Sequence, residues 1–231
     1  MNNIIELKKD LLRYSFKHNL GHIPSALSMF DYVFDLFSNH LVKIDDKIVI
    51  GKPFGAQTYY IIWKYLGYLK DIDNLSIAVK HDEIDFVDYS EETIGDSLGV
   101  ATGIAMTTDK LVWVNLTDAT LQMGATLEAI QFIGQHQLKN ILVTVDYNGA
   151  QVTGKVNDII QVDPVIDFFK NYGWEVNHNL NNFKIGNKPK VFILKTKKGS
   201  GIHSMESNIQ KWHYKKIENP EELEDLIKEL R

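Results

Sequence analysis

The sequence contains no cysteine among its 231 residues, only five prolines and no long uninterrupted apolar run. Without cysteine the chain can form neither a disulfide nor a cysteine-ligated zinc site, so a bound metal must be held by oxygen or imidazole ligands. No stretch approaches the ~20 apolar residues that a membrane-spanning helix needs. Positive charge is not in excess either, since 25 Lys and Arg stand against 30 Asp and Glu. A nucleic-acid-binding face and a membrane span are therefore not expected.

The N-terminal segment "MNNIIELKKDLLRYSF" carries charges throughout. It lacks the basic start, apolar run and cleavage site of a signal peptide, and we therefore expect a cytoplasmic protein. With 44% hydrophobic residues, the chain can bury a substantial core, and we expect one domain spanning residues 1–231.

Apolar periodicity predicts an alternation of strands and helices. Four runs rich in β-branched residues are typical of buried strands: 47–50, 111–117, 140–146 and 190–196. Helical spacing is found at 3–17, 26–38, 57–67, 95–106, 124–138, 164–172 and after Asn219. Ser25 or Ser28 could cap the second helix, and residues 71–92 indicate a loop. The pattern predicts an α/β fold with a doubly wound, mostly parallel sheet and helices on both faces.

Polar side chains follow two of the predicted strands. Asp118 follows the strand that ends at Thr117, and Asn148 comes 30 positions later (148 − 118), after the next strand. If these strands are neighbours, a carboxylate and an amide oxygen converge at the carboxyl edge of the sheet, where ligands of such folds bind. The pair suits Mg²⁺, and the helix that follows Asp118 could bind a diphosphate. Alternatively, Asp118 is a helix cap and Asn148 belongs to an ordinary Asn-Gly turn.

Five segments, in order along nearly the whole chain, resemble motifs of the transketolase family. They are "GHIPSALS", "GKPFGAQTYYIIWKYLGYL", "TIGDSLGVATGIAM", the run from "VWVNLTDATLQMG" to "VDYNGAQVTG", and "ILKTKKGSGIHSMESNIQKWHY". The fourth resembles the family's thiamine-diphosphate motif, in which Gly-Asp-Gly is followed after roughly thirty residues by Asn. The resemblance implies the diphosphate-binding domain of a thiamine-diphosphate-dependent enzyme.

The resemblance also implies roles for individual residues. Asp118 and Asn148, with the backbone carbonyl of Ala150, would hold the Mg²⁺ that bridges the cofactor diphosphate. Histidines in matching segments would line the cofactor and the sugar substrate, namely His22, His213 and, in "KHDE", His81. The remaining cofactor contacts would come from two turns, Thr93, Ile94 and Gly95 in one and Ala119 and Thr120 in the other.

Four positions depart from the family pattern. Thr117 and Ala119 replace the glycines of Gly-Asp-Gly, Met123 replaces a glutamate that lies at the subunit interface in transketolases, and Phe54 replaces a histidine. The metal carboxylate is kept, while the substrate pocket loses polar groups. These changes favour a specialised relative that acts on a branched or modified sugar.

The resemblance stops before the pyrimidine-binding and C-terminal domains of the family. It implies that these lie on a separate chain, in an α2β2 assembly that transfers a two-carbon ketol unit from a ketose to an aldehyde. Two alternatives remain open from the sequence. The chain could be a 2-oxo-acid decarboxylating or acyloin-forming subunit, or a catalytically degenerate structural or regulatory subunit.

Overall fold

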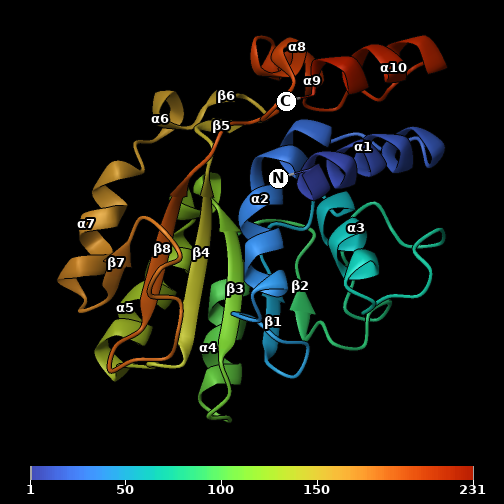
Figure 1. Cartoon of the computed structure of the whole chain (residues 1–231). Coiled ribbons are helices and arrows are strands. Elements are labelled where there is room, and N and C mark those ends of the chain that lie inside the picture. Colours follow the sequence, from blue (N-terminus) through green and yellow to red (C-terminus); the bar gives the residue numbers. More distant parts are fainter. Residues whose placement is uncertain (1, 231) are drawn as a thin grey trace. The chain divides into compact units, whose positions relative to one another are not determined.

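The computed structural model describes residues 2–230 (Figure 1). The described chain consists of two compact units. The helical unit comprises residues up to His40, Phe54–Ala78 and residues from Thr196 onward, and the sheet unit comprises Leu41–Pro53 and Val79–Lys195. Within residues 2–230, no helix combines the length and the apolar character needed to cross a bilayer.

The sheet unit is built on six strands, all paired in parallel. Their order across the sheet is β2-β1-β3-β4-β8-β7. Their bounds are Lys47–Ile50 for β1, Tyr89–Ser90 for β2, Val112–Thr117 for β3, Ile141–Tyr147 for β4, Glu175–Asn177 for β7 and Lys190–Lys195 for β8. Because β3 and β4 are neighbours in register Thr117↔Asp146, the residues that follow them emerge at one edge of the sheet.

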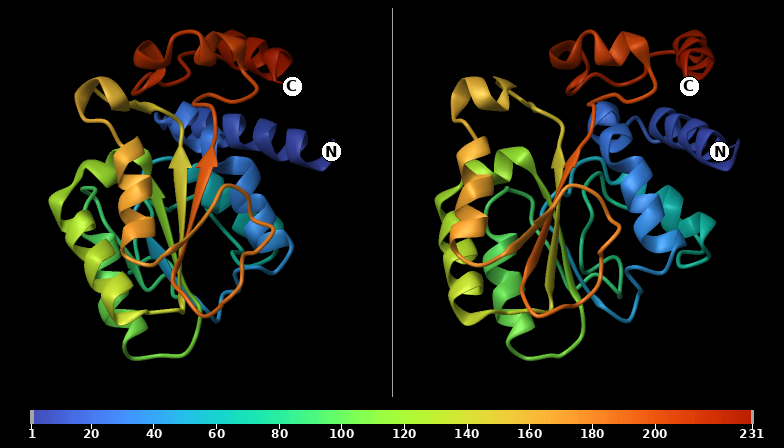
Figure 2. Two further views of the ribbon diagram at one scale, coloured as in Figure 1. Left: turned by 90° about the vertical axis from the view of Figure 1, so that its left-hand side faces the viewer. Right: turned by 60° about the vertical axis from the view of Figure 1, so that its left-hand side comes forward.

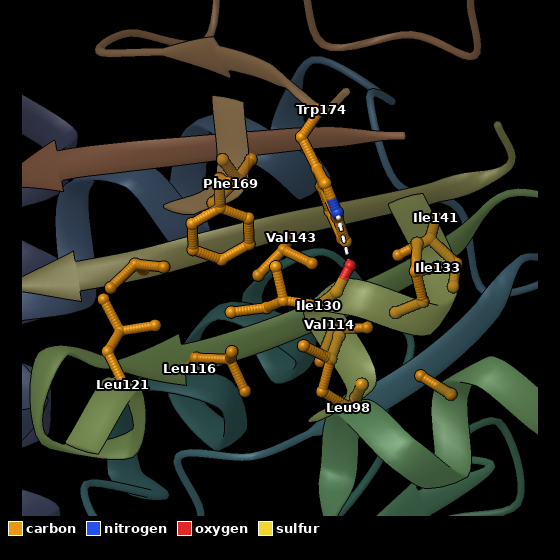
Figure 3. Close-up of a cluster of buried hydrophobic side chains, with 14 of the residues drawn as sticks. Leu98, Val114, Leu116, Leu121, Ile130, Ile133, Ile141, Val143, Phe169 and Trp174 are labelled. Carbon is orange, nitrogen blue, oxygen red and sulfur yellow. Dashed lines mark hydrogen bonds between the residues drawn. The ribbon is translucent and has the colours of Figure 1, made fainter. Parts of the chain in front are cut away.

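Three helices of the sheet unit lie on one face of the sheet, as Figure 2 shows: α4 (Ser97–Ala105), α5 (Gly124–His136) and α7 (Asp163–Asn171). Their apolar side chains and those of the strands form a core that includes Val114, Ile130 and Phe169 (Figure 3). Trp174 belongs to the same core, and its Nε1 donates a hydrogen bond to the carbonyl of Ile130 at 3.0 Å. Ile48, Trp113 and Leu142, which alternate with core residues, are also fully buried. Strands buried on both faces explain the nearly continuous apolar runs.

Short elements connect the strands at the carboxyl edge. They are the 3₁₀ helix η1 (Asp118–Gln122), an antiparallel ribbon of β5 (Ala150–Gln151) and β6 (Gly154–Lys155), and α6 (Val156–Ile159). Gln122 ties two of them together, because its Nε2 donates to the carbonyls of Val156 and Ile160. This edge is therefore a hydrogen-bonded structure rather than a set of independent loops.

The helical unit contains no strand among its described residues. Its helices are α1 (Asn2–Lys17), α2 (Ile23–Ser38), α3 (Gln57–Tyr65), α8 (His203–Glu206), α9 (Ile209–Trp212) and α10 (Pro220–Glu229). α1, α2 and α3 pack against one another, and α10 packs against α1. Asn219 caps α10 as predicted, since its Oδ1 accepts from the Glu222 N–H at 2.8 Å.

The predicted α/β fold with a mostly parallel sheet is confirmed, and β1 has the predicted bounds. The prediction that Ser25 or Ser28 caps the second helix is wrong, because α2 begins at Ile23 and both serines lie inside it. Pro24 permits this early start, since proline is tolerated in the first turn of a helix. The segment 71–92 is mostly loop, but it ends in the two-residue strand β2, which is too short to show a periodic pattern.

Candidate functional site

Asp118 is the centre of a hydrogen-bonded cluster at the carboxyl edge of the sheet. It follows β3 directly, and its side chain is fully buried. One carboxylate oxygen accepts from the Ala119 N–H at 2.8 Å and from the Thr117 hydroxyl at 3.1 Å. The other accepts from the Gly149 N–H at 2.5 Å. The carboxylate thus joins the end of β3 to the turn that follows β4.

Burial dominates the electrostatics of Asp118. It raises the pKa of this carboxyl to about 6, the hydrogen bond from Gly149 opposes the shift, and the nearby negative charge of Asp146 adds to it. A carboxylate held in this way is stabilised by any cation that binds beside it.

Asn148 lies in the turn after β4, and both ends of its amide are engaged. Its Nδ2 donates to Oδ2 of Asp146 at 2.8 Å, and its Oδ1 accepts from the Ala150 N–H at 3.1 Å. The same Asp146 oxygen accepts a hydrogen bond from the ammonium group of Lys52, and both side chains of this ion pair are buried. The interval between Asp118 and Asn148 therefore does bring the two residues into one cluster, with Gly149 between them.

The donor atoms of this cluster fit Mg²⁺. They are a carboxylate, an amide oxygen and the backbone carbonyl of Ala150, all hard oxygen donors. No group of three or more His, Asp or Glu side chains that could hold a metal occurs among residues 2–230. Few protein oxygens suffice where phosphate oxygens complete the octahedron of a Mg²⁺ ion. A cavity of about 140 Å³ beside Asp118 and Gly149 is also lined by Lys155 and Asp158.

The turn at 93–95 is held by a buried carboxylate. Both oxygens of Glu91 accept backbone N–H groups at the start of α4, from Gly95 at 3.1 Å, Asp96 at 2.9 Å and Ser97 at 2.7 Å. Thr93 is exposed and Ile94 half-buried, while Gly95 is buried with φ +137°, a conformation suited to glycine. Burial raises the pKa of Glu91, and the three backbone hydrogen bonds oppose that shift.

Ala119 and Thr120 lie in η1, directly after Asp118, and both are buried. The Thr120 hydroxyl has no hydrogen-bond partner within the described part of the chain. A buried hydroxyl without a partner is costly, and a ligand oxygen is one way to satisfy it. This observation supports a polar ligand beside η1.

A second group of predicted site residues lies in the helical unit. The rings of His22 and His213 are 5.3 Å apart in an edge-on arrangement, and Tyr214 lies 5.1 Å from His22. Gly21 makes this possible, because a Cβ on it would lie 2.8 Å from the carbonyl oxygen of Tyr214. Phe54 stacks on His22 at 4.8 Å with 27° between the ring planes. His22 itself adopts the left-handed conformation, with φ 55°.

His213 is held as a neutral imidazole. Nζ of the buried Lys198 lies 3.1 Å from its Nδ1. An ammonium group can only donate, so Nδ1 is the acceptor and the neutral ring carries its proton on Nε2. The pKa of His213 is lowered to about 4, chiefly by burial and also by the positive charges of Lys198 and His22.

His81 differs from the other predicted residues. It lies in the turn after Lys80 and is exposed, and no hydrogen bond or ring contact is found for it in the described structure. Within the sheet unit it is not drawn into the Asp118 cluster. Its role stays a prediction.

The departures from the family pattern have visible consequences. Thr117 supplies Asp118 with a hydrogen bond that glycine could not donate. Met123 packs against the turn at Gly95, where an added Cβ would lie 3.3 Å from the Met123 Cβ. Phe54 places an apolar ring on His22.

The sequence points to no role for four polar residues, Lys52, Glu91, Asp146 and Lys198, although Asp146 stands with Asn148 at the end of its predicted strand. All four are buried. Glu91, Asp146 and Lys198 are hydrogen-bonded to a predicted site residue, and Lys52 is bonded to Asp146. Lys52, Asp146 and Lys198 lie inside the motifs quoted above, and this position is a signal for a role at the site. Nothing in the local pattern indicates that Glu91 folds back onto the N–H groups of residues 95–97.

The family model described as "Transketolase, thiamine diphosphate binding domain" matches residues 97–202. Among curated proteins, the chain is 24% identical over 256 residues to one subunit of the apulose-4-phosphate transketolase of Phocaeicola vulgatus, covering 96% of this chain and 90% of the relative. It is also 24% identical over 247 residues to "6-deoxy-6-sulfo-D-fructose transketolase subunit SqwG" of a Clostridium species, covering 92% and 90%.

Solved structures share the fold. A transketolase from Campylobacter jejuni superposes with a TM-score of 0.76 at 21% identity, and one from Pichia stipitis with 0.74 at 17%. The superposition includes 91% of this chain for the Campylobacter protein and 98% for the Pichia protein. This chain spans only 40% and 44%, respectively, of the length of those two proteins. This chain is thus similar over residues 97–202 to the thiamine-diphosphate-binding domain of transketolases, and over most of its length to relatives named as transketolase subunits.

Proposed function

We propose that this chain is the N-terminal subunit of a thiamine-diphosphate- and Mg²⁺-dependent transferase that moves a two-carbon ketol unit from a ketose to an aldehyde. The observation that carries the proposal is the cluster of Asp118, Asn148 and Ala150 at the carboxyl edge of the sheet. It offers the oxygen donors that a diphosphate-bridging Mg²⁺ requires. When bound, thiamine diphosphate supplies the thiazolium carbon that carries the ketol unit.

The residues of this chain bind and orient the cofactor. Asp118 and Asn148 would hold the metal, and the turn at 93–95 and the start of η1 would contact the cofactor. His213, with its proton on Nε2, would donate a hydrogen bond to an oxygen of cofactor or substrate, and His22 would lie beside it. His81 would be a further substrate contact. All these roles are part of the proposal.

We further propose a partner chain that carries the pyrimidine-binding and C-terminal domains, with active sites formed in an α2β2 assembly. Two relatives that this chain covers to 90% of their length are named as subunits, which supports a division between two polypeptides. Residues 1–231 would form one diphosphate-binding domain, and the assembly would be cytoplasmic.

The substrate we propose is a modified or branched sugar rather than an ordinary pentose phosphate. Phe54 stacks on His22 and covers one face of its ring with a side chain that can neither donate nor accept a hydrogen bond. The relatives named for apulose 4-phosphate and for 6-deoxy-6-sulfo-D-fructose support such specialisation.

The proposal is tested by reconstitution. The chain and its partner, with thiamine diphosphate and Mg²⁺, are incubated with a panel of ketoses and aldehydes that includes the sugars in the relatives' names. We expect ketol transfer from at least one modified sugar, and none from the chain alone. Activity of the isolated chain would refute the need for a partner. Ordinary turnover of xylulose 5-phosphate with ribose 5-phosphate, near the ~10 per second typical of enzymes, would refute the specialisation.

A further inference from the structure

A buried ion pair lies next to the proposed metal ligands. We propose that Lys52 and Asp146 are positioning residues, which hold the amide of Asn148 with its oxygen toward the metal ion. This inference rests on the proposed function, since it concerns the same metal site. It adds two residues that do not themselves bind the metal.

The ion pair crosses the end of the sheet. Lys52 follows β1 and Asp146 lies near the end of β4, while β3 runs between these two strands. The two residues are 94 positions apart in the sequence, and Lys52 is 5% and Asp146 0% exposed. Burial of two charges costs free energy that their attraction need not recover. The Lys52–Asp146 ion pair is therefore better explained by a role in orienting the Asn148 side chain than by a contribution to the stability of the fold.

The ion pair leaves Asn148 one orientation. Oδ2 of Asp146 accepts from the Lys52 ammonium and from Nδ2 of Asn148. A carboxylate can only accept, so the NH₂ group of the amide must face Asp146. Its oxygen then points the other way, where it accepts from the Ala150 N–H and keeps a second lone pair. A flipped amide would set its oxygen against a carboxylate and its NH₂ against the cation.

Lys52 also balances charge in the cluster. Asp118 and Asp146 are both buried and close enough to repel each other. The ammonium group compensates Asp146, so Asp118 is the carboxylate that remains for the metal. Outer partners that orient metal ligands are typically worth about 10- to 100-fold in metal affinity.

The test uses the full chain purified with its partner protein, with Mn²⁺ as the probe in the presence of thiamine diphosphate. Free Mn²⁺ is measured by electron paramagnetic resonance for the wild type and for the double variant Lys52→Met, Asp146→Asn, which removes both charges and lets the amide turn. We expect Mn²⁺ affinity to fall about 10- to 100-fold. The matched control is Lys47→Met, Asp88→Asn, an ion pair at the other end of β1 with 2.7 Å between its charged groups, and it should bind Mn²⁺ normally.

A third change separates orientation from general damage. Asn148→Asp, added to the double variant, presents an oxygen whichever way the group turns, and should restore most of the affinity. Unchanged affinity in the double variant, or failure of this rescue, would overturn the inference while leaving the proposed function intact. If the wild type takes up no Mn²⁺, the proposed function fails and the inference with it.

A second measurement, of hydrogen exchange at the Asn148 side chain, needs no substitution at the ion pair. It therefore tests the inference even if the double variant does not fold. The side-chain NH₂ signal of Asn148 is assigned in the wild type by its loss in Asn148→Asp. Because Asp146 holds this NH₂, it should exchange with water more slowly than the exposed amide of Asn187. Equal exchange rates would overturn the inference.

Discussion

At the scale of single residues, the site contains buried and half-buried polar groups whose partners fix their protonation and orientation. Asp118 is buried and bonded to two backbone N–H groups, and His213 is half-buried and bonded to an ammonium group. Burial works in opposite directions on the two, since it disfavours the charged form of each. It raises the pKa of Asp118 to about 6 and lowers the pKa of His213 to about 4.

The state of His213 can be tested by a histidine NMR titration, with the signal assigned by its loss in His213→Gln. We expect a midpoint near pH 4 and, above it, a proton on Nε2. Lys198→Met should raise the midpoint but leave it below the ordinary 6.5, because burial is the larger cause. A midpoint near 6.5 in the wild type would contradict the half-buried, lysine-bonded ring.

The same shift predicts the sign of a pH dependence. Between pH 6.5 and 4 the unfolded chain binds a proton at His213 that the folded chain does not, so the free energy of unfolding should fall as the pH falls through this window. Urea unfolding of the wild type and His213→Gln at several pH values measures it. If the wild type and His213→Gln lose the same free energy of unfolding between pH 6.5 and 4, His213 makes no such contribution.

At the scale of elements, close approach between helix and turn explains individual glycines. In α5, a Cβ at Gly134 would lie 2.1 Å from the carbonyl oxygen of Tyr172, which lies just after α7. In α4, a Cβ at the exposed Gly103 would meet nothing within 4 Å. Both glycines lie inside helices, but only Gly134 is needed for close packing, since a side chain at Gly103 would meet no other atoms.

Substituting alanine at these positions should give effects of opposite sign. Gly134→Ala should destabilise the protein by about 1–3 kcal/mol, because the backbone must move to admit the methyl group. Gly103→Ala should stabilise it by up to about 1 kcal/mol, because alanine is the better helix former. Urea unfolding compares the two. Equal effects would show that α5 does not approach Tyr172 as described.

The cap of α10 gives a further prediction. Asn219→Ala should cost about 1 kcal/mol of unfolding free energy, since it leaves the Glu222 N–H without its acceptor. The control Asn187→Ala removes an exposed asparagine from a loop and should change stability by no more than about 0.5 kcal/mol. Equal losses would argue against the cap.

At the scale of the whole molecule, the sequence predicted the parallel sheet because its strands are long apolar runs between helical patterns. The sequence also predicted that Asp118 and Asn148 lie close together, because a 30-residue interval spans one helix between neighbouring strands. It could not predict β2 or the β5–β6 ribbon, which are two residues long and held by backbone pairing. Nor could it find Glu91 or the Lys52–Asp146 pair, whose partners are set by the folded chain and not by local spacing.

The central claim is that this chain binds thiamine diphosphate through Mg²⁺ held by Asp118 and Asn148. The most direct test is calorimetric titration of thiamine diphosphate into the chain and its partner with Mg²⁺ present. We expect saturable binding in the wild type and in Asp109→Ala, an exposed aspartate before β3. Asp118→Ala should bind at least about 100-fold more weakly, since even outer partners of metal ligands are worth about 10- to 100-fold. No binding by the wild type, or equal binding by Asp118→Ala, would contradict the claim.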